Sequence, residues 1–242
     1  MRRLVIPYES IQNDLRTGDL FLARGQRWLS LVIRVLTLSP WTHCGMIVLP
    51  RDLGLEDRLE SDEPHLWESM NSSTVPCKLT RKNLGPESER RLGPMLVPLR
   101  SRIAKSVSFG HYDRFAVRHL RRELDPDLRA RLRTVVCDPY FAQCSFPGYA
   151  EMFREAYGER WFGRNEAGPF DRLYCSHLLA LTFQRMGLIP DLPYPESYIA
   201  ADFSSEGCLP LLRRVEYGRE IFVTVKGVDR RRPLIATLLR HG

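Results

Sequence analysis

The stretch that most constrains the fold is LYCSHLLALTFQRMGLIP, from Leu173 to Pro190, because its apolar positions are nearly continuous. This pattern predicts a helix. Gly187 fits a C-terminal cap, Pro190 follows just beyond it, and Asp171 stands close enough before the helix to act as its N-cap. The clearest helix of the chain is therefore expected here, and it begins near Cys175.

Short apolar segments bounded by turn residues or charged residues predict strands. They run from Gly18 to Arg24, Thr42 to Leu49, His65 to Met70, Met95 to Leu99, Arg114 to Leu120 and Glu220 to Val225. Further helices are expected from Gln26 to Leu38 and from Pro126 to about Cys137. Strands and helices are partly segregated along the chain, which indicates the α+β class.

The length and composition favour a single domain. A chain of 242 residues with 43% hydrophobic residues can bury a substantial core. Two charged stretches, residues 51–64 and 81–94, are expected to be loop insertions, and a basic tail is expected after residue 225.

The net charge of +7 favours an anionic partner, but the arginines are spread along the chain. We therefore expect no specific nucleic-acid binding and at most weak contact with anionic membranes. The predicted helix from Gln26 to Leu38 has one narrow polar stripe and a broad apolar face. We expect this helix to be mostly buried by its own domain; the alternative is a surface that receives a lipid or lies at a membrane.

The six cysteines are too few for a disulfide scaffold and do not match common zinc modules, so neither a structural metal nor a cofactor is expected. The first ten residues have too short an apolar run for a signal peptide, and no stretch is long enough to span a bilayer. A reducing cytoplasm is the expected compartment.

His43 and Cys44 lie side by side in a predicted strand, where adjacent side chains point to opposite faces. They therefore cannot pair with each other. A helix N-terminus stabilises a thiolate, and only Cys175 stands at the start of a strong helix. Glu68, on a strand expected beside that of His43, is a candidate to orient the imidazole.

Three stretches in this order resemble the permuted NlpC-type, papain-like cysteine amidase family, which includes relatives of lecithin:retinol acyltransferase. GDLFLAR is similar to its opening strand, SPWTHCGMIV to its histidine strand, and LWESM to the strand with the third polar residue; DRLYCSHLL is similar to the start of its cysteine helix. The histidine precedes the cysteine, which is the circularly permuted order. One departure is His177, where the family commonly has a glutamate.

The resemblance implies a permuted papain-like fold, an antiparallel sheet packed against helices, and a cysteine hydrolase mechanism. Cys175 would be the nucleophile, His43 the proton carrier and Glu68 the residue that fixes the imidazole tautomer. Tyr174 and His177 are candidates to bind substrate. We expect cleavage of an amide bond in a peptide or aminoacyl-type substrate. A lipid-directed thiol acyltransferase or esterase, and a silent binding protein on the same scaffold, remain open.

Overall fold

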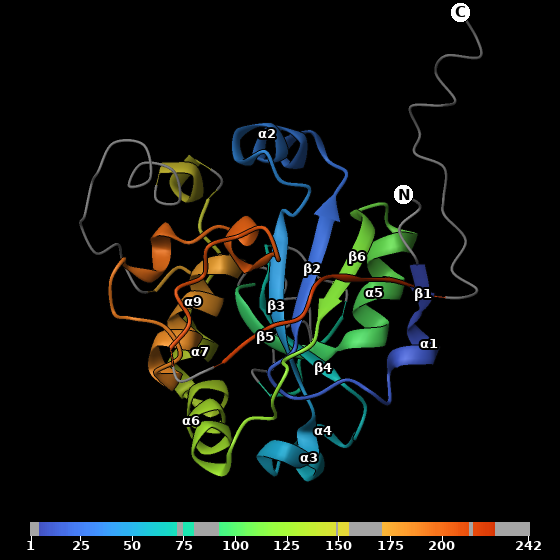
Figure 1. Cartoon of the computed structure of the whole chain (residues 1–242), viewed down its shortest axis with the longest axis vertical. Coiled ribbons are helices and arrows are strands. Elements are labelled where there is room, and N and C mark those ends of the chain that lie inside the picture. Colours follow the sequence, from blue (N-terminus) through green and yellow to red (C-terminus); the bar gives the residue numbers. More distant parts are fainter. Residues whose placement is uncertain are drawn as a thin grey trace, which may run out of the picture.

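The chain is built on one mixed sheet of seven strands, in the order β1-β7-β6-β2-β3-β4-β5 (Figure 1). The computed structural model describes residues 5–71, 75–79, 92–148, 150–154, 171–212 and 215–225. The strands are β1 (Val5–Pro7), β2 (Leu20–Gly25), β3 (His43–Val48), β4 (His65–Ser69), β5 (Pro94–Pro98), β6 (Tyr112–Arg118) and β7 (Ile221–Thr224). The α+β class is confirmed, and all six predicted strands are present.

The sheet is not wholly antiparallel as expected, because β1 runs parallel to β7. The other neighbours pair antiparallel; in the central pair, for example, Leu20 lies opposite Met46. The extra strand β1 comes from a three-residue segment that sequence analysis left unassigned. Three residues are too few to show an alternation of apolar and polar positions, so the sequence pattern does not indicate this edge strand.

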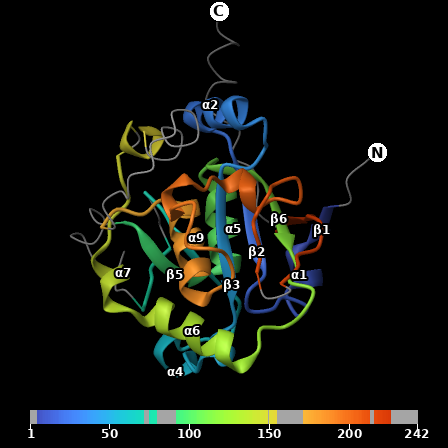
Figure 2. The ribbon, with the colours of Figure 1, turned by 60° about the vertical axis from the view of Figure 1, so that its left-hand side comes forward.

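Helices cover both faces of the sheet (Figures 1 and 2). They are α1 (Tyr8–Ile11), α2 (Trp28–Thr37), α3 (Pro50–Leu53), α4 (Glu56–Leu59), α5 (Leu99–Ser108), α6 (Pro126–Cys137), α7 (Pro139–Gln143) and α9 (Cys175–Met186), with 3-10 turns η2 (Pro195–Ser197) and η3 (Ala200–Phe203). Strand β4 touches both layers through alternate residues. The Trp67 indole donates to Thr182 of α9 at 3.1 Å, whereas Glu68 meets Arg102 of α5.

The predicted helices α6 and α9 are confirmed, but the N-cap predicted for α9 is wrong. Gly187 ends α9 with a positive φ of 70° and donates to Gln184 and Phe183, as the C-cap prediction requires. Asp171 is not the N-cap: Tyr174 holds that position and supplies no side-chain cap. The extended residues before Tyr174 move Asp171 too far from the first turn.

The predicted insertions have different outcomes. Residues 51–64 are not a plain loop, because α3 and α4 form there, with Pro50 at the start of α3 and Gly54 at its left-handed end. Residues 80–91 lie outside the described residues, and the second insertion ends where Pro94 enters β5. The tail from residue 226 onward also lies outside them.

The helix α2 contradicts the expectation of burial. None of its residues is buried, and Trp28, Leu31 and Val35 are 76%, 53% and 63% exposed. Its polar residues Ser30 and Arg34 lie instead on the half-buried side. Among the described residues, no helix is both long and apolar enough to cross a bilayer.

A buried carboxylate joins the start of β2 to the end of β6. Asp19 accepts hydrogen bonds from the backbone of Arg16 at 2.9 Å, the backbone of Leu120 at 2.8 Å and the ring of His119 at 2.7 Å. Gly18 directs the chain to Asp19 with a φ of 101°. Residues with a side chain adopt this backbone conformation only at an energetic cost. The Gly-Asp pair that opens β2 is therefore a structural junction.

Replacing Asp19→Ala should lower the free energy of unfolding by about 3 kcal/mol, because three donors lose a charged acceptor. Urea unfolding measures this change. The control is Glu216→Ala, which breaks an exposed ion pair with Arg121 and should change stability by less than about 1 kcal/mol. Equal effects of the two variants would contradict this role for Asp19.

Candidate active site

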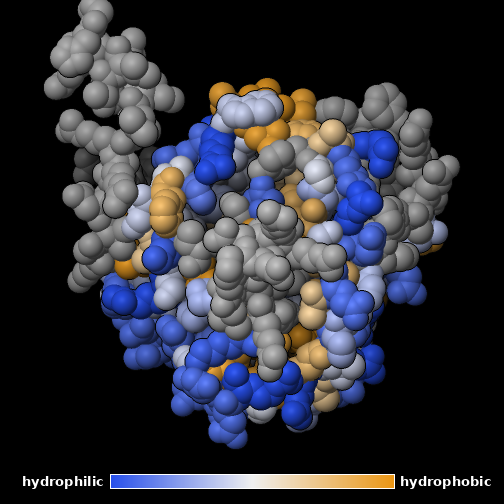
Figure 3. All heavy atoms as spheres, turned by 180° about the vertical axis from the view of Figure 1, so that it is seen from behind, coloured by the Kyte–Doolittle hydropathy of each residue, from blue (hydrophilic) through white to orange (hydrophobic). Residues whose placement is uncertain are grey.

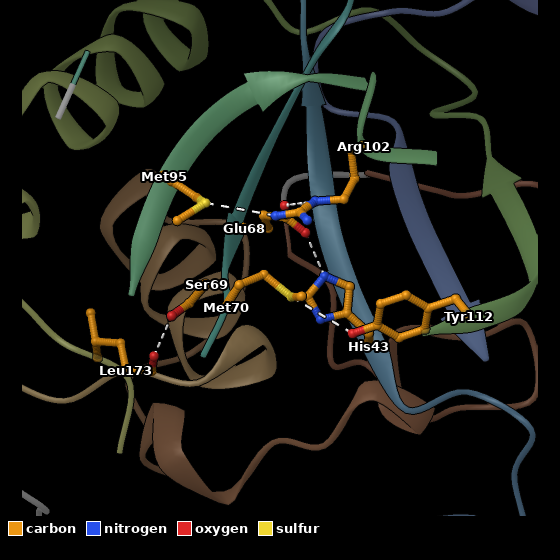
Figure 4. Close-up of polar contacts among 8 residues, drawn as sticks. All are labelled: His43, Glu68, Ser69, Met70, Met95, Arg102, Tyr112 and Leu173. Atoms are coloured by element: carbon orange, nitrogen blue, oxygen red, sulfur yellow. Dashed lines mark hydrogen bonds and ion pairs between the residues drawn. The ribbon is translucent and has the colours of Figure 1, made fainter. Parts of the chain in front are cut away.

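His43 lies at the beginning of β3, and its ring is held by a buried carboxylate on the neighbouring strand β4. The Nε2 atom of His43 lies 2.6 Å from Oε2 of Glu68 (Figure 4). Both residues are buried, Glu68 completely. This bond leaves Nδ1 as the ring nitrogen available to another partner.

Arg102 of α5 completes the support of Glu68. Its Nε donates to Oε1 of Glu68, and its Nη2 lies 3.7 Å from Sδ of Met95 (Figure 4). Burial alone would raise the pKa of Glu68, but the charge of Arg102 and the hydrogen bond with His43 outweigh it and lower that pKa. Glu68 therefore stays ionised although it is buried.

Cys175 is the first residue of α9 and lies half-buried at the N-terminal end of β3. Its side chain lines the same cavity as His43, and His43 and Cys44 both act on the pKa of its thiol. Near this helix start, Ser69 of β4 donates to the carbonyl of Leu173, which ties the segment before Cys175 to the sheet (Figure 4).

These contacts set the charge of the thiol. Polar interaction with Cys44, followed by the charge of His43, lowers the pKa of Cys175 well below its ordinary value despite burial. Burial would lower the pKa of His43, but the Cys175 charge and Glu68 raise it to about 9. Both shifts favour a Cys175 thiolate beside a His43 imidazolium over the neutral pair.

Cys44 itself stays protonated. Burial, followed by the hydrogen bond and charge of Cys175, raises its pKa. It therefore does not compete with Cys175 as a nucleophile. Cys44 is not the partner of His43, in agreement with strand geometry, but its contact with Cys175 was not predicted.

A small cavity of about 100 Å³ opens over the sulfur and the imidazole. Its lining includes Cys175, His43, Tyr112 and Met70, together with Leu29 and Ile33 from α2. The Tyr112 ring lies 5.5 Å from the His43 ring, and its hydroxyl lies 3.6 Å from Sδ of Met70 (Figure 4). The cavity over the thiol is therefore lined by both apolar and polar side chains, the latter including Arg27 and His111.

The two predicted substrate-binding residues lie elsewhere. Tyr174 and His177 are only 2% and 1% exposed, and neither is among the described residues that line this cavity. Tyr174 donates to the carbonyl of Glu196, and its ring contacts His177 edge-on at 5.4 Å. Both side chains pack beneath the site, between α9 and η2.

His177 is a buried neutral histidine. Within the described part of the chain, neither of its ring nitrogens has a hydrogen-bond partner, and Glu196 lies 4.0 Å away. Burial lowers its pKa to about 3. No group of three or more histidine, cysteine, aspartate or glutamate side chains among the described residues is arranged to hold a metal.

A larger cavity of about 890 Å³ lies apart from this site, beside β7. Its most buried cation, Arg118, already donates to the carbonyls of Gly218 and Phe203 at 2.9 Å and 2.6 Å. Neither His43 nor Cys175 lines it. Of these two cavities, only the smaller one is therefore lined by the candidate nucleophile and base.

Arg102 and Cys44 were missed by sequence analysis. Helix α5 buries Leu99, Arg102, Ile103 and Ser106 on one face, so half of its inward positions are polar and no apolar stripe marks the helix. An arginine between two apolar positions of a helix was the available signal. Cys44 gave the pattern of an ordinary buried residue.

The fold is α+β, and one cavity brings together Cys175, whose pKa is lowered, and His43, which is held by Glu68. No family model matches the chain, and no curated protein matches it. Among solved structures, one match is the crystal structure of the metalloprotein yiiX from Escherichia coli. It is 17% identical, with a TM-score of 0.44, over 90% of this chain and 93% of that chain. This likeness is too low to carry fold details or function to this chain.

Replacing Arg102→Met should slow alkylation of Cys175 at pH 6 and lower the free energy of unfolding by about 3 kcal/mol or more, because Glu68 loses its buried counter-charge. Mass spectrometry and urea unfolding measure the two effects. The matched control on the same helix is Arg100→Met, whose side chain is 55% exposed. Arg102→Met behaving like this control would refute the supporting role.

The wild type should become less stable as the pH falls below 6.5, because the unfolded chain protonates His177 whereas the folded chain does so only near pH 3. This group contributes a slope of about 1.4 kcal/mol per pH unit. His177→Leu should flatten the stability curve between pH 6 and 4.5, measured by urea unfolding. Parallel curves for the two proteins would show that His177 is not buried in its neutral form.

Proposed function

We propose that this protein is a cysteine hydrolase of the permuted papain-like, NlpC-type fold, and that it cleaves an amide bond through Cys175, His43 and Glu68. The observation that carries the proposal is the contact of a thiol at a helix start with an imidazole fixed by a buried carboxylate. The order of these elements, with the histidine strand before the cysteine helix, supports the permuted family. The preference for amides rests on that resemblance.

In the first half of the reaction, the Cys175 thiolate attacks the carbonyl carbon of the substrate and a C–S bond forms. Backbone N–H groups of the first turn of α9 have no acceptor within the helix and would donate to the developing oxyanion. The His43 imidazolium gives its proton to the leaving amine as the C–N bond breaks. An acyl-enzyme and a neutral imidazole remain.

In the second half, neutral His43 takes a proton from water, whose oxygen attacks the acyl carbon. The C–S bond breaks, the carboxylic acid leaves and the thiolate–imidazolium pair is restored. Glu68 stays hydrogen-bonded to Nε2 of His43 in both halves, so Nδ1 is the nitrogen that gives and takes the proton. Arg102 holds Glu68 and does not touch the substrate.

A second candidate is a lipid-directed thiol acyltransferase or esterase. The exposed apolar residues of α2 favour it, because the same helix lines the cavity over Cys175. A silent binding protein is the third candidate, and the following experiment separates it from both enzymes. We place the protein in a reducing cytoplasm; the described residues include all six cysteines, and no disulfide joins them.

Iodoacetamide should label Cys175 rapidly at pH values well below the ordinary thiol pKa of about 8.5. The rate at pH 6 should fall at least about tenfold in His43→Ala, because the imidazolium stabilises the thiolate. Peptide mass spectrometry measures the rates, and the exposed Cys208 in the same molecule gives an internal reference.

Incubation with 4-nitrophenyl acetate should then transfer one acetyl group to Cys175, seen as a mass shift of its peptide, and not in His43→Ala. Labelling of Cys175 no faster than Cys208, and unchanged by His43→Ala, would exclude the enzyme proposals. Fast labelling without acetyl transfer would support a thiol of lowered pKa but would exclude the proposed acyl transfer.

A further inference from the structure

Helix α2 turns its apolar side away from the protein. Its outward residues follow helical spacing and are well exposed: Trp28 76%, Leu31 53%, Val32 38%, Val35 63% and Leu36 39%, with Leu38 at 91% just after the helix. Figure 3 shows the hydrophobic cap that results at the top of the molecule, where α2 lies in Figure 1. A soluble surface rarely carries so many neighbouring large apolar side chains without a partner.

The inward side of the same helix is the less apolar one. Ser30, Arg34 and Thr37 are half-buried there, together with Leu29 and Ile33. An amphipathic helix that only stabilised the fold would turn its more apolar side inward. The more apolar side of α2 instead faces outward, where it can bind an apolar surface.

The charges near α2 are of both signs. Arg24 is ion-paired with Asp113 and Arg34 is half-buried, whereas Asp202 and Glu206 line a pocket beside the end of the helix. Arg27 is exposed at the start of the helix, and its Nη2 lies 2.9 Å from the ring of His111. Burial and the charge of Arg27 lower the pKa of His111, so this histidine is neutral near pH 7. The exposed apolar side of α2, the exposed Arg27 at its start and the net charge of +7 together favour an anionic, lipid-covered partner.

We propose that α2 docks this protein on an anionic membrane surface, with the side chains of Trp28, Leu31, Val32, Val35 and Leu36 inserted between the lipids. Helix α2 lies at one end of the molecule (Figure 1), where its exposed side can meet a flat bilayer. Ten residues span about 15 Å, so the helix lies in the interface and does not cross it.

Docking in this orientation brings the cavity to the membrane. Leu29 and Ile33 on the inner side of α2 line the cavity that contains Cys175. The thiolate therefore lies directly below the helix that touches the lipids. The docking surface itself does not depend on the acyl-transfer proposal, because none of its outward residues takes part in that chemistry.

Co-sedimentation of the full-length chain with vesicles tests the proposal. Binding should be strong to phosphatidylcholine mixed with phosphatidylglycerol, weaker to phosphatidylcholine alone, and reduced by salt. The double variant Leu31→Glu, Val35→Glu should bind the mixed vesicles at least about tenfold more weakly. Both positions are exposed, so folding should be retained, which circular dichroism and urea unfolding check.

The matched control is Leu192→Glu with Leu212→Glu, which adds the same charge at leucines 57% and 44% exposed elsewhere on the surface. It should bind like the wild type, and so should Cys175→Ala, whose binding separates docking from catalysis. Two results would overturn the proposal. In the first, the wild type does not bind the mixed vesicles; in the second, both double variants lose vesicle binding equally. A wild-type dimer that the α2 variant converts to monomer, without vesicle binding, would assign the exposed side of α2 to self-association instead.

Discussion

The ionised carboxylate of Glu68 is the group on which the rest of the site depends. A charge with no solvent contact is costly unless other groups compensate it, and here Arg102 and His43 each hold one of its oxygens. This pairing fixes the imidazole by its Nε2 atom and joins α5 to the β3–β4 pair. The position of the histidine is therefore set by a buried charge network rather than by packing alone.

The thiol comes from the other layer of the fold. Helix α9 packs on the sheet face opposite α5, and its first residue reaches the end of β3, where both His43 and Cys44 contact it. Two successive residues of one strand thus act on one thiol, because Cys44 and His43 both lower its pKa. The site forms only where the two layers meet at the end of a strand, and α2 encloses it from outside.

Much of the architecture could be predicted because its signals are local. Apolar runs located six strands, and the near-continuous apolar positions with Gly187 located α9. The failures have physical causes. Helix α5 has polar residues at inward positions, and β1 is too short for a pattern. For α2 the periodicity was correct but the direction was wrong, because amphipathicity does not specify which side faces solvent.

The sequence by itself determined the α+β class, the placement of Cys175 at a helix start and the separation of His43 from Cys44 by strand alternation. These follow from backbone periodicity and the chemistry of helix ends, which act over a few residues. Only the tertiary structure decided that Arg102 supports Glu68, that Cys44 contacts Cys175, that Tyr174 and His177 pack beneath the cavity, and that α2 faces outward. Those features join residues far apart in the chain, and their energies depend on burial and mutual distance, which local pattern does not encode.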